Sequence, residues 1–132
     1  LLQNVEILTG DYQQTLDKAK GNTLFYFDPP YRPLSNTSSF NDYAKEAFND
    51  LAQERLKYFC DRIEEAGYAF MLSNSDCFNT PQQDRFFEDL YLEYIIERVW
   101  ASRSVNANAS KRGKLQEILV HNYVNTKKLL AI

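Results

Sequence analysis

Glycine is scarce in this chain, and the positions of its glycines exclude one kind of ligand loop. The four glycines, at positions 10, 21, 67 and 113, lie far apart in the sequence. A nucleotide-like cofactor bound by an α/β fold needs a glycine-rich turn, because only glycine allows such a close approach of the backbone. The sequence therefore predicts that this chain carries half of such a site.

Histidine, cysteine and long apolar runs are also scarce. The single histidine, His121, argues against a histidine-based metal site, and we expect no metal. Cys60 and Cys77 lack the spacing of metal or redox motifs, which predicts buried, reduced thiols in a cytoplasmic protein. No apolar run approaches the roughly 20 residues of a membrane span. No signal peptide is visible, so we expect no membrane contact.

Charge is divided unequally along the chain. Residues 101–132 contain six basic residues and one acidic residue, Glu117, which gives them a net charge of +5 and leaves −8 for the first hundred residues. The basic residues are Arg103, Lys111, Arg112, Lys114, Lys127 and Lys128. This division predicts either a local contact with a polyanion or a solvated basic loop, and charge alone favours the solvated loop.

The apolar pattern predicts strands that alternate with helices. The expected strands are Val5–Leu8, Thr23–Phe27, Tyr68–Leu72, Leu92–Trp100 and Gln116–Tyr123. The expected helices are Tyr12–Lys20, a helix that is capped by Asn49 and stopped at Gly67, and a helix that opens with a capping box at Thr80–Gln83 and ends near Leu90. This order predicts an α/β fold with parallel strands. The last two strands have no helix between them, so we expect an antiparallel hairpin at one edge of the sheet.

Three polar stretches are expected at the carboxyl ends of strands, where open α/β sheets bind their ligands. They are Gly10–Tyr12, Asp28–Tyr31 and Ser73–Asp76. Asn74 and Asp76 could contact a ligand or could cap the turn before Thr80, and both interpretations stay open. For Trp100 and His121 we expect structural roles within their strands.

The stretch Asp28-Pro29-Pro30-Tyr31 ends a continuous apolar strand and suits the exocyclic amine of a flat base. An adenine amine is a poor nucleophile because its lone pair is delocalised into the ring. The Asp28 carboxylate and a carbonyl of the proline segment can accept its two N–H groups, which directs the lone pair at an electrophile. The prolines stiffen the turn, and Tyr31 offers a ring for a base swung out of a duplex. In isolation, the four residues could equally be a turn after a strand.

More residues match one family. The stretch DPPYRPLSNTSSFNDY from Asp28 to Tyr43 resembles the Dam-type (D12 class) DNA adenine-N6 methyltransferases, in which DPPY is followed by x-P-x-S-x-T-x-x-F-x-x-Y. LSNSD, which ends at Asp76, is similar to the family's strand-end S-N-x-D. RSVNANASKRGKLQEILVHNY, which ends at Tyr123, is similar to its closing loop and last strand. The resemblance spans Val5 to Tyr123 in three ordered blocks.

The resemblance implies a Rossmann-like methyltransferase sheet, S-adenosylmethionine as the methyl donor and double-stranded DNA as the partner. Asp28 to Tyr31 would hold the target adenine, and Asp28 would also border the donor. Asp11 and Tyr12 match the position that lines the donor's adenine. The residues implied to face DNA are Ser35, Thr37, Arg103, Lys111, Arg112 and Lys114. The implied activity is adenine-N6 methylation at GATC or a related site, in a cytoplasmic protein of bacterial or phage type.

Several family segments have no match in this chain: the N-terminal donor-binding lysine, the F-x-G-x-G loop and the target-recognition helices. We therefore expect residues 1–132 to be the C-terminal part of one catalytic domain, inactive without the N-terminal portion of the same protein. Two alternatives stay open. One is an amino-methylase for RNA, cytosine N4 or protein glutamine, since such enzymes use related [DN]PP[YFW] turns. The other is an inactive module that binds nucleic acid or a partner protein. A restriction endonuclease as a partner is also left open.

Overall fold

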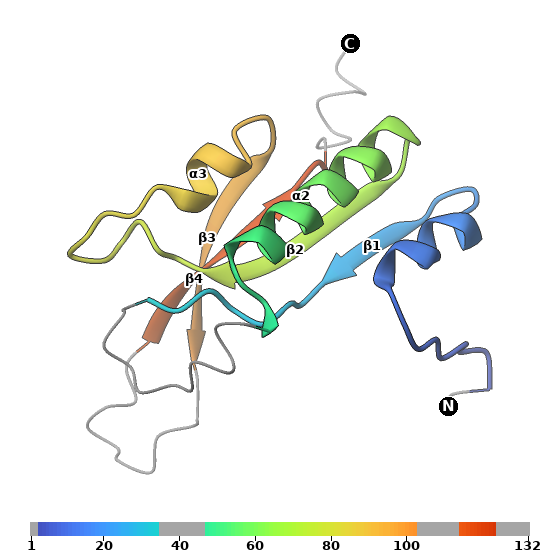
Figure 1. Cartoon of the computed structure of the whole chain (residues 1–132), viewed down its shortest axis with the longest axis horizontal. Helices are drawn as coiled ribbons and strands as arrows, with labels where there is room; N and C mark the ends of the chain where they lie inside the picture. Colours follow the sequence, from blue (N-terminus) through green and yellow to red (C-terminus); the bar gives the residue numbers. More distant parts are fainter. Residues whose placement is uncertain (1–2, 35–46, 103–113, 124–132) are drawn as a thin grey trace.

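The computed structural model describes residues 3–34, 47–102 and 114–123, and these form a mixed sheet of four strands (Figure 1). The strands are β1 (Leu24–Phe27), β2 (Ala69–Ser75), β3 (Ile95–Ser102) and β4 (Lys114–His121), arranged in the order β1-β2-β4-β3. β1 and β2 are parallel, whereas β4 is antiparallel to both β2 and β3. The expected α/β class and the antiparallel hairpin at one edge are confirmed. The Rossmann-like arrangement stays a prediction.

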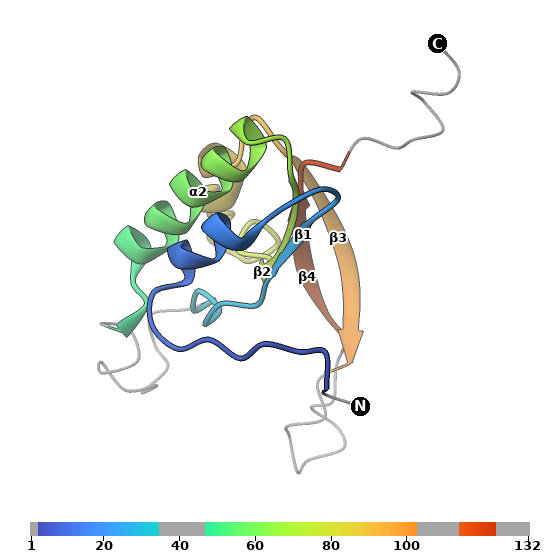
Figure 2. The same ribbon diagram turned by 90° about the vertical axis from the view of Figure 1, so that its right-hand side faces the viewer.

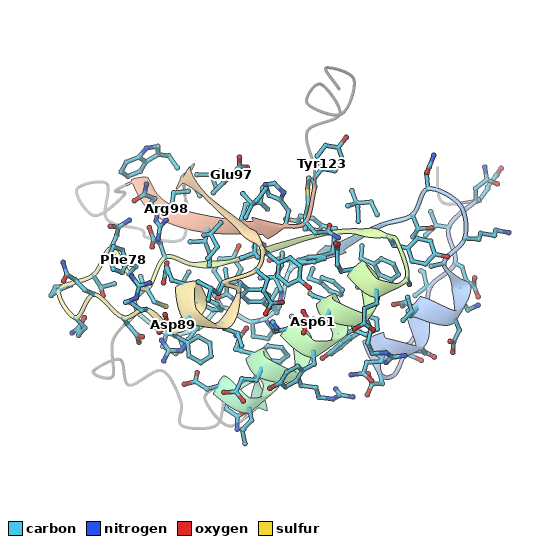
Figure 3. The ribbon with its side chains drawn as sticks, turned by 90° about the horizontal axis from the view of Figure 1, so that it is seen from above. Asp61, Phe78, Asp89, Glu97, Arg98 and Tyr123 are labelled. Carbon is cyan, nitrogen blue, oxygen red and sulfur yellow. The ribbon has the colours of Figure 1, made fainter. Side chains whose placement is uncertain are left out.

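The helices of the described residues lie on one face of the sheet (Figure 2). They are the 3-10 helix η1 (Tyr12–Lys18), α2 (Asp50–Glu65) and α3 (Phe86–Leu90). Alternate residues of the strands point toward them, which forms an apolar core. Its fully or almost fully buried members include Phe25, Phe70, Leu72, Ile118 and Val120 from the sheet and Leu56, Phe59, Cys60 and Ile63 from α2. Figure 3 shows Asp61 on the helical side of the sheet and Glu97 and Tyr123 on the opposite side.

Helix α2 follows its sequence signals at both ends. The Asn49 side chain accepts a hydrogen bond from the Ala52 N–H at 3.0 Å, which confirms the predicted N-cap. Gly67 follows the helix with a φ of 83°, a conformation that favours glycine. Leu51, however, is 72% exposed, because its position in the first turn points away from the sheet. The polar side chain of Gln53 is fully buried on the helix face that packs on the sheet.

Two expected elements are wrong, and the first is the strand Val5–Leu8. This segment forms no regular structure, and Val5 and Ile7 are 55% and 79% exposed. No strand among the described residues lies beside it, so its β-forming residues have no ladder to join.

The helix expected from a capping box at Thr80 is the second. Residues 80–83 form a turn in which the Gln83 N–H donates to the Thr80 carbonyl at 3.0 Å. Gln83 has a φ of 49°, which no helix accommodates. Helix α3 begins at Phe86 instead, where the Asp84 carboxylate accepts from the Phe86 N–H at 3.0 Å.

The structure also decides several single-residue expectations. Both cysteines are buried and free, as predicted. Trp100 is 68% exposed on β3, so its expected place in the core is wrong. β1 was expected to be covered on both faces, but it is an edge strand among the described residues, and Tyr26 is 62% exposed. No helix in the described ranges is long and apolar enough to cross a membrane.

Candidate functional site

The carboxyl ends of the parallel strands β1 and β2 meet at one edge of the sheet, and Asp28 lies there. It directly follows β1, and its Oδ1 accepts a hydrogen bond from the Ser73 hydroxyl of β2 at 3.2 Å. Asp28 is exposed, so its carboxylate remains accessible to a ligand while Ser73 orients it.

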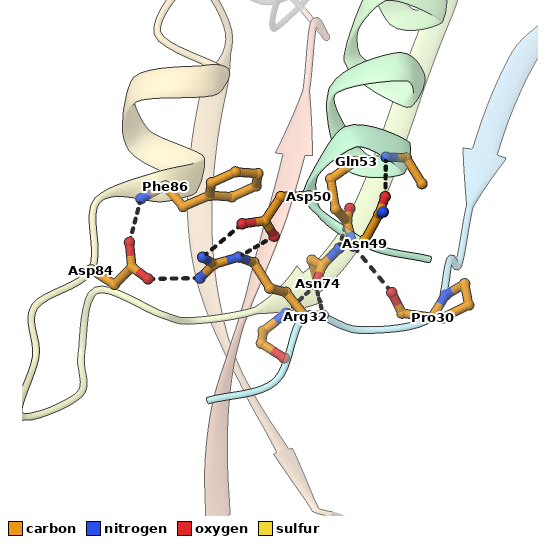
Figure 4. Close-up of polar contacts among 10 residues, drawn as sticks. Pro30, Arg32, Asn49, Asp50, Gln53, Asn74, Asp84 and Phe86 are labelled. Carbon is orange, nitrogen blue, oxygen red and sulfur yellow. Dashed lines mark hydrogen bonds and ion pairs between the residues drawn. The ribbon is translucent and has the colours of Figure 1, made fainter. Parts of the chain in front are cut away.

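Two buried side-chain amides hold the turn that follows Asp28 (Figure 4). The Gln53 Nε2 group donates to the Pro30 carbonyl at 3.2 Å, and the Arg32 N–H donates to Asn74 Oδ1 at 2.9 Å. The two amides are joined, since Asn74 Nδ2 donates to Gln53 Oε1 at 3.2 Å. The main-chain groups on both sides of Tyr31 are therefore fixed to α2 and β2.

The guanidinium of Arg32 ties the same turn to two further segments. Its Nε lies 2.8 Å from Asp50 Oδ1, its Nη1 lies 2.7 Å from Asp84 Oδ2, and it stacks 4.3 Å above the centre of the Phe86 ring. The hydrogen bonds to Asp50 and Asp84 raise the pKa of Arg32, and its guanidinium lowers the pKa of the Asp84 carboxyl. Arg32 is thus a permanent cation that joins the turn to α2 and to the segment before α3.

Tyr31 reaches from the turn to the far side of β2. Its hydroxyl donates to Glu117 Oε2 of β4 at 3.2 Å, and the residue is half-buried. Burial, and to a smaller degree Glu117, raises the pKa of the Tyr31 hydroxyl, which therefore stays protonated at neutral pH. This contact orients the ring.

A cleft of about 240 Å³ lies beside the turn. Its lining includes Tyr12, Tyr26, Asp28, Pro29, Phe48 and Leu56. Tyr12 packs edge-on against Phe27 and Phe59, with ring centres 6.3 and 5.3 Å apart. The cleft is therefore mostly apolar, with the Asp28 carboxylate at its lining.

Asp11 precedes Tyr12 but is engaged elsewhere. Its carboxylate accepts from the Gln13 N–H at 2.9 Å, which caps η1, and it pairs with Arg55 of α2. These contacts, the Gln13 bond first, lower the pKa of Asp11. The structure thus brings Tyr12 and Asp28 to one cleft and turns the Asp11 side chain toward Arg55.

The predicted DNA-facing residues cannot be placed in the same way. Ser35, Thr37, Arg103, Lys111 and Arg112 lie outside the described residues, and Lys114 is described only as the first residue of β4. The described ranges hold no group of three or more His, Cys, Asp or Glu side chains that could bind a metal ion.

The two readings of the S-N-x-D segment separate. Asp76 accepts from the Asn79 N–H at 3.4 Å and from Arg98 Nε at 3.1 Å, which is the capping role. Asn74 points instead to the turn after Asp28.

Sequence reasoning missed Gln53, Arg32 and Glu117. A polar residue on the apolar face of α2 was the one available signal, and it concerned Gln53. Arg32 and Glu117 find their partners far away in sequence, where no local pattern points to them.

Comparison with known proteins gives consistent matches. The family model described as D12 class N6 adenine-specific DNA methyltransferase matches residues 1–105. A type II methyltransferase of Methanocaldococcus jannaschii is 41% identical over 124 residues, and one of Lactococcus lactis subsp. cremoris is 38% identical over 122 residues. A DNA adenine methylase of Vibrio cholerae is 30% identical over 118 residues. The matches cover 93%, 92% and 89% of this chain but only 41%, 40% and 40% of these relatives, so the chain spans about two fifths of their length.

Proposed function

Because the chain belongs to the D12 class of N6 adenine-specific DNA methyltransferases, we propose that the protein containing it methylates N6 of adenine in double-stranded DNA. The observation that carries the proposal is the Asp28 carboxylate, exposed at a strand end and oriented by Ser73 beside an apolar cleft. In this proposal the target base is swung out of the duplex and enters the site beside Asp28.

Asp28 and Pro29 are the proposed acceptors for the adenine amine. The Pro30 carbonyl already accepts from Gln53, so the Pro29 carbonyl is the better candidate for the second acceptor. Two hydrogen bonds from N6 to these oxygens would pull the nitrogen lone pair out of conjugation and aim it away from both acceptors. Tyr31 would stack on the base, and its Glu117 contact would keep the ring in place.

Tyr12 and Asp28 are proposed to form one wall of the methyl-donor pocket, with Asp11 beside them. The donor set fits, since an apolar cleft with one carboxylate suits a flat, positively charged nucleoside. S-adenosylmethionine, when bound, supplies the electrophilic methyl group. Because transfer is direct, the residues here act by positioning the amine more than by acid–base catalysis.

DNA contacts are proposed for Ser35, Thr37, Arg103, Lys111, Arg112 and Lys114. Basic side chains in this set would bind phosphates and supply most of the affinity. GATC or a related sequence is the proposed target, since several relatives are named DNA adenine methylases. Relatives named type II methyltransferases make a restriction endonuclease a proposed partner.

The test is methylation by the full-length protein. Purified protein, S-adenosylmethionine and duplexes with or without GATC are incubated, and hydrolysed nucleosides are analysed by mass spectrometry. We expect N6-methyladenine from the GATC duplex. Methylcytosine, a methylated protein or no product would contradict the proposal, and each outcome corresponds to one of the alternatives left open by the sequence.

A further inference from the structure

We propose that Gln53 and Asn74 are positioning residues for methyl transfer: their joined amides hold the main chain on both sides of Tyr31 and thereby fix the acceptors for the amine. This inference rests on the proposed function. It concerns residues that do not line the cleft described above and that act through the turn.

The burial of the two amides is the first step of the argument. Gln53 and Asn74 are both 0% exposed. Buried polar groups are costly unless they are paired, and here the pairing is directed at one place. Asn74 Oδ1 accepts from the N–H groups of Arg32 and Ser75, both at 2.9 Å, and the Gln53 amide connects Asn74 to Pro30 (Figure 4).

The composition of the turn is the second step. Pro29 and Pro30 have no N–H groups, so the turn cannot be held by main-chain donors at these positions. The Pro30 carbonyl and the Arg32 N–H are the groups through which α2 and β2 hold it. They flank Tyr31, so their positions set the direction of the ring and of the adjoining Pro29 peptide.

The consequence for catalysis is the third step. Direct transfer depends on the alignment of amine and acceptors, and a displacement of about 1 Å far from the chemistry can cost about a hundredfold in rate. Loss of either amide should therefore lower kcat. It should leave DNA affinity unchanged, because phosphate contacts outside the turn supply that affinity.

The experiment uses the full-length enzyme with Gln53→Met, Asn74→Ala and the double variant. We expect kcat to fall about a hundredfold in each single variant while the Kd for DNA changes less than about threefold. The double variant should be no slower than the slower single variant, because the two amides act as a unit. Asn74→Asp keeps an acceptor for the Arg32 N–H and should recover part of the loss.

Ile63→Val is the matched control. Ile63 lies on the same helix and is equally buried, but it contacts only the core, so this variant should lose stability and keep kcat. Hydrogen exchange of the 27–34 segment provides a readout that needs no activity, and exchange at the Arg32 N–H should become about tenfold faster in Gln53→Met and Asn74→Ala.

An active wild type whose folded variants keep kcat, or keep slow exchange at Arg32, overturns the positioning role alone. A wild type that methylates no adenine overturns the proposed function and this role with it.

Discussion

The Ser73 hydroxyl donates a hydrogen bond to Oδ1 of Asp28 at 3.2 Å, across the carboxyl ends of two parallel strands. The sheet itself thus orients the carboxylate that we propose to hold the target amine. Ser73 is 8% exposed, so little water competes for this contact.

Removal of this contact should reduce the rate without abolishing it. Ser73→Ala deletes one hydrogen bond to a charged group, and we expect single-turnover methylation to slow about tenfold. Ser75→Ala is the control, since Ser75 lies on the same face of β2 with the same exposed fraction. Equal rates for the two variants would show that Ser73 does not orient Asp28.

Tyr31 should act mainly through its ring. Tyr31→Ala should destabilise the extruded adenine by roughly 1–3 kcal/mol, which is the usual contribution of base stacking. Tyr31→Phe keeps the ring and loses only the bond to Glu117, so it should retain much of the activity. Fluorescence of 2-aminopurine at the target position measures extrusion. If Tyr31→Phe is as inactive as Tyr31→Ala, the hydroxyl is part of the chemistry and the stacking role is wrong.

The basic segment should act on affinity. Replacement of Lys111, Arg112 and Lys114 together by alanine should weaken binding to all duplexes alike. It should also lower the salt dependence by about one unit of slope per lost phosphate contact. Binding isotherms across a salt series measure both effects, and Lys18→Ala, which removes a cation paired with Glu6, is the control. An unchanged slope in the triple variant would identify a solvated loop.

Acid should weaken the attachment of the turn to the segment before α3. The Arg32 guanidinium lowers the pKa of Asp84 in the folded state, so this pair stabilises the fold above the unfolded pKa of about 3.9. That stability is lost as the pH falls through the lower folded pKa.

Asp84→Asn keeps the cap on Phe86 and should flatten this part of the curve of unfolding free energy against pH. Asp89→Asn, at an exposed position on α3, is the control. If Asp84→Asn leaves the acid limb as steep as in the wild type, the Arg32 contact contributes nothing to it.

The sequence was sufficient for the strand that ends in Asp28, for helix α2 and for the antiparallel hairpin. Each of these depends on local signals: an apolar run before prolines, an Asn N-cap with a Gly stop, and two strands without a helix between them. Local signals failed where a distant partner decides the conformation. Thr80–Gln83 has the composition of a capping box, but Asp84 determines where α3 begins. Val5–Leu8 has the composition of a strand, but the described residues offer it no partner.

The same limit applies to the candidate site. Asp28 and its neighbours could be identified from their chemistry, because the motif is contiguous. The side chains that hold the motif are separated from it by 23 and 42 positions, as with Gln53 to Pro30 and Asn74 to Arg32. Nothing in the sequence between them indicates that α2 and β2 bring these amides together.

Asp28 offers the most direct test of the account. In the full-length enzyme, Asp28→Ala should lower kcat for adenine-N6 methylation by on the order of a hundred- to a thousandfold, because one charged acceptor of the amine is lost in the transition state. Asp28→Asn retains a neutral acceptor and should lose less. DNA affinity should stay close to that of the wild type in both variants, since phosphate contacts dominate it. Turnover by Asp28→Ala at a near wild-type rate would contradict the assignment of Asp28 as the residue that holds the target amine.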